Sequence, residues 1–288
     1  MPTRKAGVKA ESDAESNVVT QPFLPWIAGA PTLTDAPLSL GEQCILDELT
    51  KILALPAIPD NMLPRAAELV PQMIALLRET QLPLQAIAER VSKDDMLAAE
   101  VMRLASSPYY RSQGEVVDVV QAIRLIGSLG LQTVIARVVL KPIYRGASSS
   151  ISADVALRLW EHSEALAQLT AVHAEIAGQQ AFDGYLVGML HNTGWKVALC
   201  AMERAGRQPG AQPSGAFASA LVEQVHRLFG LAAQRWSISP GFVAFANDAR
   251  TNGLAGGTHP MAAILQHAQR QSMAEATHRA HAVQSDNN

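Results

Sequence analysis

The stretch YLVGMLHNTG, residues 185–194, decides the fold class of this chain. Apolar residues recur in and around it every three or four positions, which is the spacing of a buried helical face. A helix over residues 182–204 buries this face, with His191 and Asn192 at its flank; its members are Phe182, Leu186, Leu190, Thr193, Val197 and Cys200. We therefore expect helix at the centre of the protein.

The same spacing continues through most of the chain, and long alternations of Val, Ile and Thr are absent. Helix formers dominate and aromatic residues make up only 5% of the sequence, so the expected fold class is all-α. Ser92 with Asp95 three residues later predicts a capping box at the start of one helix. The predicted helices cover residues 40–53, 62–79, 83–91, 94–107, 117–126, 128–140, 153–177, 182–204, 216–235, 239–248 and 259–280.

Two segments divide the chain. Residues 1–37 are polar and then rich in proline, which predicts a disordered or loosely docked arm. Residues 145–151, RGASSSI, predict a hinge between two helical lobes, over residues 38–145 and 152–280. We expect residues 281–288 to fray, and the surface near residues 105–125 to pack against the second lobe.

The arm carries a short apolar cluster, PFLPWI, at residues 22–27. The segment is too short and too rich in proline to form a core of its own, and soluble monomers usually avoid exposing such a patch. It therefore docks on this chain's own lobes, on a second copy or on a partner. We expect docking on the chain's own lobes, with an interaction peptide as the alternative.

Composition argues against several functions, and we expect no nucleic-acid partner. The 288 residues carry a net charge of −3, so no basic excess indicates a nucleic-acid partner, and Tyr109-Tyr110-Arg111 lacks the basic field of a base-stacking site. The two cysteines form no disulfide framework and suit a reducing compartment. Apolar runs such as residues 134–140 are too short to span a membrane. We expect a soluble, cytoplasmic protein without a membrane partner; the oligomeric state stays open.

Three histidines lie on or beside the predicted apolar faces of the second lobe: His162 and His226 are on such a face, and His191 flanks one. Helices that face one another would bring them together, with Asn192 beside them. Burying three unpaired imidazoles is costly. A bound metal ion satisfies them, and so do mutual hydrogen bonds and water; the sequence leaves both open.

The dyad His191-Asn192, followed by Gly194, reads like a metal-hydrolase motif in which an aspartate has become an asparagine. A metal-dependent phosphohydrolase needs the charge of that carboxylate to hold its cation. An amide has no charge and a lower affinity for a hard divalent cation. The residue that would indicate catalysis is therefore missing.

The order of several motifs resembles the HDOD domain, a divergent relative of the HD metal-dependent phosphohydrolases. The matching stretches are LPAIP at residues 55–59, SKDD at 92–95, VMRLASSPYY at 101–110, QAIRLIG at 121–127, WEHS at 160–163, GMLHNTG at 188–194, and residues 222–240 with His226, Gly230, Trp236 and Ser239-Pro240. The resemblance covers roughly residues 45–250 and implies a helical fold whose second lobe is HD-like.

The resemblance also implies roles for single residues. His162 stands at the family's first metal histidine, His191 at the histidine of the dyad and Asn192 at its aspartate. His226 stands where related proteins place a later histidine. The match fails at Asn247-Asp248, where those relatives have a histidine pair, and at Trp195, where a lysine is common and Lys196 is displaced by one position.

These departures lead us to expect a vestigial metal pocket of His162, His191, Asn192 and His226, with no catalytic residue, no metal and no cofactor. The resemblance implies a non-catalytic regulatory or scaffolding module in bacterial signal transduction. Such a module acts through protein–protein interaction with other signalling proteins. The alternative is a residual HD-type phosphohydrolase acting on a nucleotide or a cyclic dinucleotide.

Overall fold

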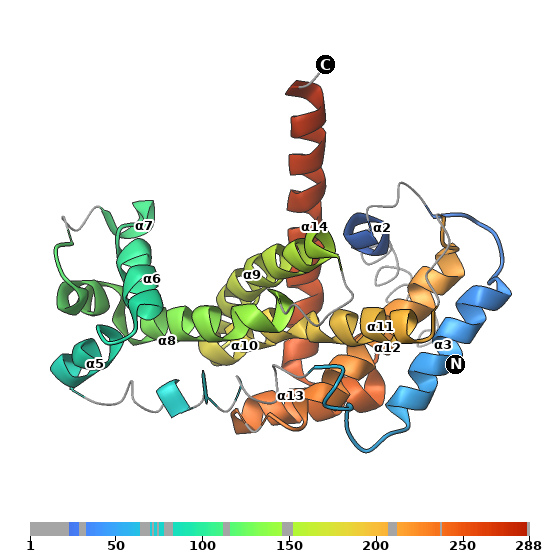
Figure 1. The fold of residues 1–288 in the computed structure, drawn as a ribbon, viewed down its shortest axis with the longest axis horizontal. Coiled ribbons are helices and arrows are strands. Elements are labelled where there is room, and N and C mark those ends of the chain that lie inside the picture. The colour runs from blue at the N-terminus through green and yellow to red at the C-terminus, as the bar shows by residue number, and fades with distance from the viewer. Residues whose placement is uncertain are drawn as a thin grey trace, which may run out of the picture. The chain divides into compact units, whose positions relative to one another are not determined.

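The computed structural model describes residues 23–28, 33–63, 70, 72–73, 75–77, 83–111, 116–145, 152–206, 212–236 and 238–286. Within these ranges every regular element is a helix, and the one isolated bridge joins Thr34 to Ser214, so the all-α expectation is confirmed (Figure 1). The helices are α2 (Phe23–Ala28), α3 (Leu40–Leu53), α5 (Leu84–Val91), α6 (Asp95–Ala105), α7 (Pro108–Arg111), α8 (Val119–Arg145), α9 (Ala153–Ile176), α10 (Ala181–His191), α11 (Thr193–Arg204), α12 (Gly215–Ala233), α13 (Pro240–Asn252) and α14 (Pro260–Asp286).

Most helices lie where the sequence patterns predict them, but several ends differ: α8 runs to Arg145 instead of residue 140, and α13 runs to Asn252 instead of residue 248. The helix expected over residues 182–204 is two helices, α10 and α11, separated at Asn192. The cap of α6 is Asp94, not Ser92: its carboxylate accepts hydrogen bonds from the backbone N–H groups of Met96 and Leu97, both at 3.0 Å. α14 continues to Asp286 instead of ending at residue 280. Much of the helix expected over 62–79, and the hinge after residue 145, lie outside the described residues.

The chain forms two compact units, one of residues 1–63 with 147–288 and one of residues 64–146. The expected N-terminal lobe of residues 38–145 is therefore corrected at its start. α3 packs on α12 and α11 within the larger unit, and it does not belong to the smaller one. Sequence spacing predicted the helix but held no information on which partner its apolar face would meet.

A buried carboxylate explains why α3 belongs there. Glu42 is only 6% exposed and accepts hydrogen bonds from the backbone N–H of Ser39 at 2.8 Å and of Ser214 at 2.7 Å. Ser39 caps α3 and Ser214 caps α12, so one side chain joins the N-termini of two helices. Burial works to raise the pKa of Glu42, but these hydrogen bonds outweigh it and hold the pKa below its ordinary value.

Replacing this carboxylate tests the link. Glu42→Ala leaves the N–H groups of Ser39 and Ser214 without their acceptor, and we expect it to lower the free energy of unfolding by about 2 kcal/mol. Urea unfolding of the full chain measures this. The matched control on the same helix is Glu48→Ala, whose exposed ion pair with Lys51 is worth at most about 0.5 kcal/mol. Equal losses in the two variants would contradict the link.

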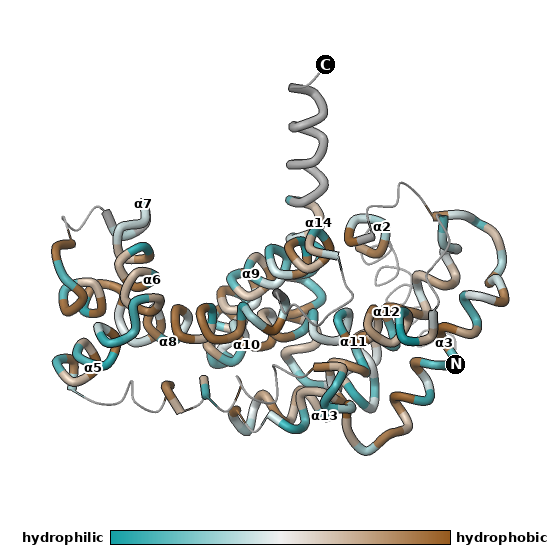
Figure 2. The backbone as a smooth tube through the Cα atoms, in the orientation of Figure 1, coloured by the Kyte–Doolittle hydropathy of each residue, from teal (hydrophilic) through white to brown (hydrophobic). Residues whose placement is uncertain are grey.

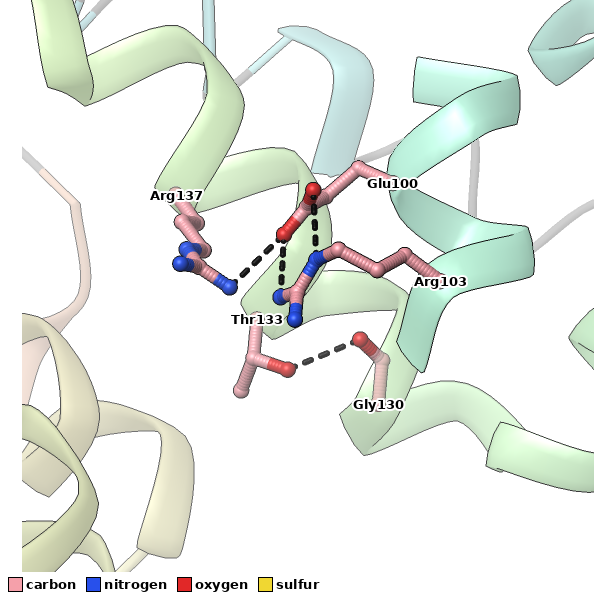
Figure 3. Close-up of polar contacts among 5 residues, drawn as sticks. All are labelled: Glu100, Arg103, Gly130, Thr133 and Arg137. Atoms are coloured by element: carbon pink, nitrogen blue, oxygen red, sulfur yellow. Dashed lines mark hydrogen bonds and ion pairs between the residues drawn. The ribbon is translucent and has the colours of Figure 1, made fainter. Parts of the chain in front are cut away.

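In the smaller unit, α8 packs against α6 and α5. Its backbone is kinked at Gly127, with φ 69°, so the expected break between two helices is confirmed. The carboxylate of Glu100 on α6 accepts from Arg103 at 2.6 and 2.9 Å and from Arg137 on α8 at 2.7 Å (Figure 3). The hydrogen bonds from Arg103 and then the charge of Arg137 hold the pKa of Glu100 below its ordinary value against the effect of burial.

Among the described helices, only the span Val119–Tyr144 is long and apolar enough to cross a membrane by length and composition. Hydrophobic residues follow one another along α8 (Figure 2). Half of its most apolar window is buried inside the protein, and Gly127 interrupts the helix. These features are those of a core helix.

Candidate functional site

The larger unit brings together all four residues that the sequence singled out. His162 comes from α9, His191 ends α10, Asn192 separates α10 from α11, and His226 comes from α12. All four side chains are buried, between 0 and 5% exposed, and Gln269 of α14 joins them at 7%. The sequence carried no signal for Gln269, because a glutamine on a helix is ordinarily a solvated residue.

Two of the histidines are hydrogen-bonded to each other. Nε2 of His191 lies 2.6 Å from Nδ1 of His226, and the amide nitrogen of Gln269 lies 3.3 Å from Nδ1 of His191. With the amide in this orientation, Gln269 donates a hydrogen bond to His191, and His191 donates one to His226. The imidazoles of His191 and His226 are then both neutral, and each carries its one proton on Nε2.

The geometry at Asn192 requires an amide. Its nitrogen faces the backbone carbonyl of Leu159 at 3.3 Å, Nδ1 of His162 at 2.9 Å and Oγ of Ser163 at 2.9 Å. A carbonyl oxygen only accepts, so the atom facing Leu159 must be a donor. A carboxylate at this position would set an oxygen against that carbonyl. Because His162 accepts at Nδ1, its own proton is on Nε2.

Burial keeps these imidazoles neutral. Loss of hydration lowers the pKa of His162 to about 4. The same cause lowers the pKa of His226 to about 3. Burial, with the neighbouring His226 and His162, holds the pKa of His191 well below 6.5. At neutral pH the cluster carries no charge.

The donor set does not fit a divalent cation. A metal ligand needs a free lone pair, yet His191 donates from Nε2 to Nδ1 of His226, and His162 accepts at Nδ1 and is protonated on Nε2. The described residues contain no group of three His, Cys, Asp or Glu side chains that could hold a metal ion. The carboxylate of Asp248, beyond the dyad, is engaged instead with Thr258 and His259 at the loop before α14.

A small cavity lies beside the histidines. Its volume of about 10 Å³ is enough for about one water molecule. The residues that line it are Phe23, His162, Asn192, Trp195, Val222, His226, Gln269 and Met273. Two of the lining residues also have a buried polar atom without a hydrogen-bond partner in the protein: Nε2 of His162 and Oδ1 of Asn192. The residues that line the cavity therefore carry one spare donor and one spare acceptor.

The arm supplies one wall of this cavity. Phe23 of α2 is 4% exposed and its ring centre lies 4.6 Å from that of His162 and 5.0 Å from that of Trp195. The expectation that the apolar cluster docks on the chain's own lobes is confirmed for residues 23–28, which are helical. Sequence reasoning placed Trp195 only as a departure from the family pattern; its role as a wall of the cavity was missed.

An all-α unit with histidines converging from three helices and a dyad at a helix break defines an HD-like helical protein. The HDOD domain family matches residues 63–249, more than half of the chain, and the chain belongs to that family. The expected resemblance is therefore confirmed. No curated protein matches the chain.

Three solved structures are similar to this chain. "Putative metal-dependent phosphohydrolase" from Shewanella amazonensis SB2B is 15% identical, with a TM-score of 0.52 over 82% of this chain and 100% of the other. "Putative phosphohydrolase" from the same organism is 17% identical, with a TM-score of 0.50 over 81% and 80%. An HDOD domain protein of unknown function from Geobacter sulfurreducens is 17% identical, with a TM-score of 0.48 over 80% and 78%. At these identities the likeness shows the fold alone.

Proposed function

We propose that this chain is a non-catalytic regulatory or scaffolding module of bacterial signal transduction. It acts in the cytoplasm through protein–protein interaction with other signalling proteins. The observation that carries the proposal is the hydrogen bond between Nε2 of His191 and Nδ1 of His226. Nε2 of His191 holds a proton and the lone pair of Nδ1 of His226 accepts it, so neither nitrogen is free to bind a metal ion. The amide of Asn192 supports it, because that position offers neither charge nor a free anionic oxygen.

The second candidate is a residual phosphohydrolase acting on a nucleotide or a cyclic dinucleotide. It is favoured by the names of two of the similar structures and by the family's relation to metal-dependent phosphohydrolases. On this alternative the cluster would have to exchange its internal hydrogen bonds for a metal ion. The opening of three buried contacts makes this a costly step.

Metal binding and turnover separate the two functions. We expect calorimetric titration of the full chain with Mn²⁺ or Zn²⁺ to show no stoichiometric binding, and a chelator to leave the melting temperature unchanged. We also expect no hydrolysis of a cyclic dinucleotide or of a simple phosphate ester. Turnover that requires the metal and disappears in His191→Ala would overturn the proposal. His173→Ala, a histidine of α9 outside the cluster, is the matched control.

Partners are then sought with the intact protein. The full chain retained on a support should capture signalling proteins from lysate of its own cell, identified by mass spectrometry. Capture that persists at high salt and depends on a folded bait supports regulation through protein contacts. A bait that retains nothing above an unrelated helical control would count against it.

A further inference from the structure

The side chains around the cavity form an aromatic slot, by which we mean the space between the rings of His162 and Trp195. Phe23 fills it, with its ring inclined by 55° to His162 and by 50° to Trp195. Tilted contacts at 4.6 and 5.0 Å between centres are favourable aromatic pairs. The slot is therefore built to receive a planar ring.

The segment that supplies this ring is held like a bound peptide. α2 is a helix of six residues with a proline in it, too short to be stable alone. It is kept in place by the burial of Phe23, Leu24 and Ile27 and by a hydrogen bond, 3.2 Å long, from Arg158 of α9 to the carbonyl of Ile27. Its attachment consists of side-chain contacts that another segment of similar chemistry can reproduce.

Phe23 is an incomplete occupant of the slot. Two residues that line the same cavity carry a spare donor, Nε2–H of His162, and a spare acceptor, Oδ1 of Asn192, and neither atom has a partner in the protein. A phenylalanine ring has no polar atom to satisfy them. The free space beside it is about the size of one water molecule, and hence of one hydroxyl group.

We propose that the aromatic slot recognises an aromatic side chain with a polar tip, a tyrosine of a partner protein, which takes the place of Phe23. A phenolic hydroxyl both donates and accepts, so it matches the spare acceptor of Asn192 and the spare donor of His162 together. This inference rests on the proposed function, since it names the surface through which a protein-binding module reads its partner. α2 then keeps the slot closed until that partner arrives.

Peptide exchange on the full chain tests the proposal. Two labelled peptides are compared by fluorescence anisotropy: PFLPWIA, the sequence of residues 22–28, and the same peptide with tyrosine in place of phenylalanine. We expect Phe23→Ala, which empties the slot, to bind the tyrosine peptide about three- to tenfold more tightly than PFLPWIA, the effect of one net hydrogen bond. The unmodified chain should bind both at least about tenfold more weakly, because Phe23 competes.

Two further variants protect the test. Arg158→Ala releases the carbonyl of Ile27 without touching the slot, so it should also raise peptide affinity, and it carries the test if Phe23→Ala does not fold by circular dichroism. Adding Trp195→Ala to Phe23→Ala removes one wall and should lower peptide binding at least about tenfold.

The proposal is overturned if the folded variants bind neither peptide, if the two peptides bind equally, or if the unmodified chain binds them as tightly as Phe23→Ala. Phosphoester turnover would overturn the proposed function and leave peptide exchange unaffected. If peptide exchange fails and no phosphoester is hydrolysed, the slot proposal is wrong while the proposed function stands, and partners would be sought at another surface. The failure of the slot proposal and the failure of the proposed function are therefore distinguishable.

Discussion

Lowering the pH from 7 to 5 is expected to destabilise this protein by at least about 4 kcal/mol, roughly 2 kcal/mol for each of His162 and His226, and His191 adds to this loss. An unfolded imidazole has a pKa near 6.5, whereas burial lowers the pKa of His162 to about 4 and that of His226 to about 3, and holds the pKa of His191 well below 6.5. Above pH 6.5 neither state takes up these protons. Below it only the unfolded state does, so stability falls as the pH drops from 6.5 towards 4.

Urea unfolding at pH 7, 6 and 5, followed by circular dichroism, measures this dependence. The matched variant is the double substitution His191→Leu with His226→Leu, because replacing either alone strands its hydrogen-bond partner. Only His162 of the cluster then titrates, and the loss between pH 7 and 5 should shrink to about 2 kcal/mol, no more than half of the loss in the unmodified chain. A wild-type stability that does not change over this range, or an unaltered dependence in the double variant, would show that the cluster is not buried in its neutral form.

A methyl group added beside the dyad should have the second large effect. We expect Gly194→Ala to lower the free energy of unfolding by about 3 kcal/mol or more, the upper range for overpacking. A Cβ atom there would overlap the backbone carbonyl of Val225 and lie 3.1 Å from the backbone nitrogen of Phe229. Both atoms belong to α12, so α11 would have to move away from the helix that carries His226.

The control for this substitution is Gly41→Ala on α3, where an added Cβ meets only Oγ of Ser39 at 3.9 Å. That variant should be neutral or slightly more stable, because alanine favours helix over glycine. Melting temperatures of the two variants measured side by side decide the matter. A Gly194→Ala protein as stable as the control would mean that α11 and α12 are not packed this closely.

The sequence determined the local features of this protein. Apolar spacing and the lack of alternating strands predicted the helices, because one turn of helix depends on neighbours three and four positions away. Family motifs placed His162, His191, Asn192 and His226 in one pocket, and they do converge. The loss of the dyad's carboxylate at Asn192 could also be seen in the sequence, because it depends only on which residue stands at that position.

The tertiary structure alone decided the contacts between distant segments. Only three-dimensional packing sets α3 on α12 through Glu42, brings Gln269 to His191, and pairs His191 with His226. No pattern in the sequence distinguished a metal ion from mutual hydrogen bonds among buried imidazoles, because both satisfy the same polar atoms. The place of Phe23 between His162 and Trp195 depends likewise on the shape of a surface built from α9 and α11, more than 130 positions further along the chain.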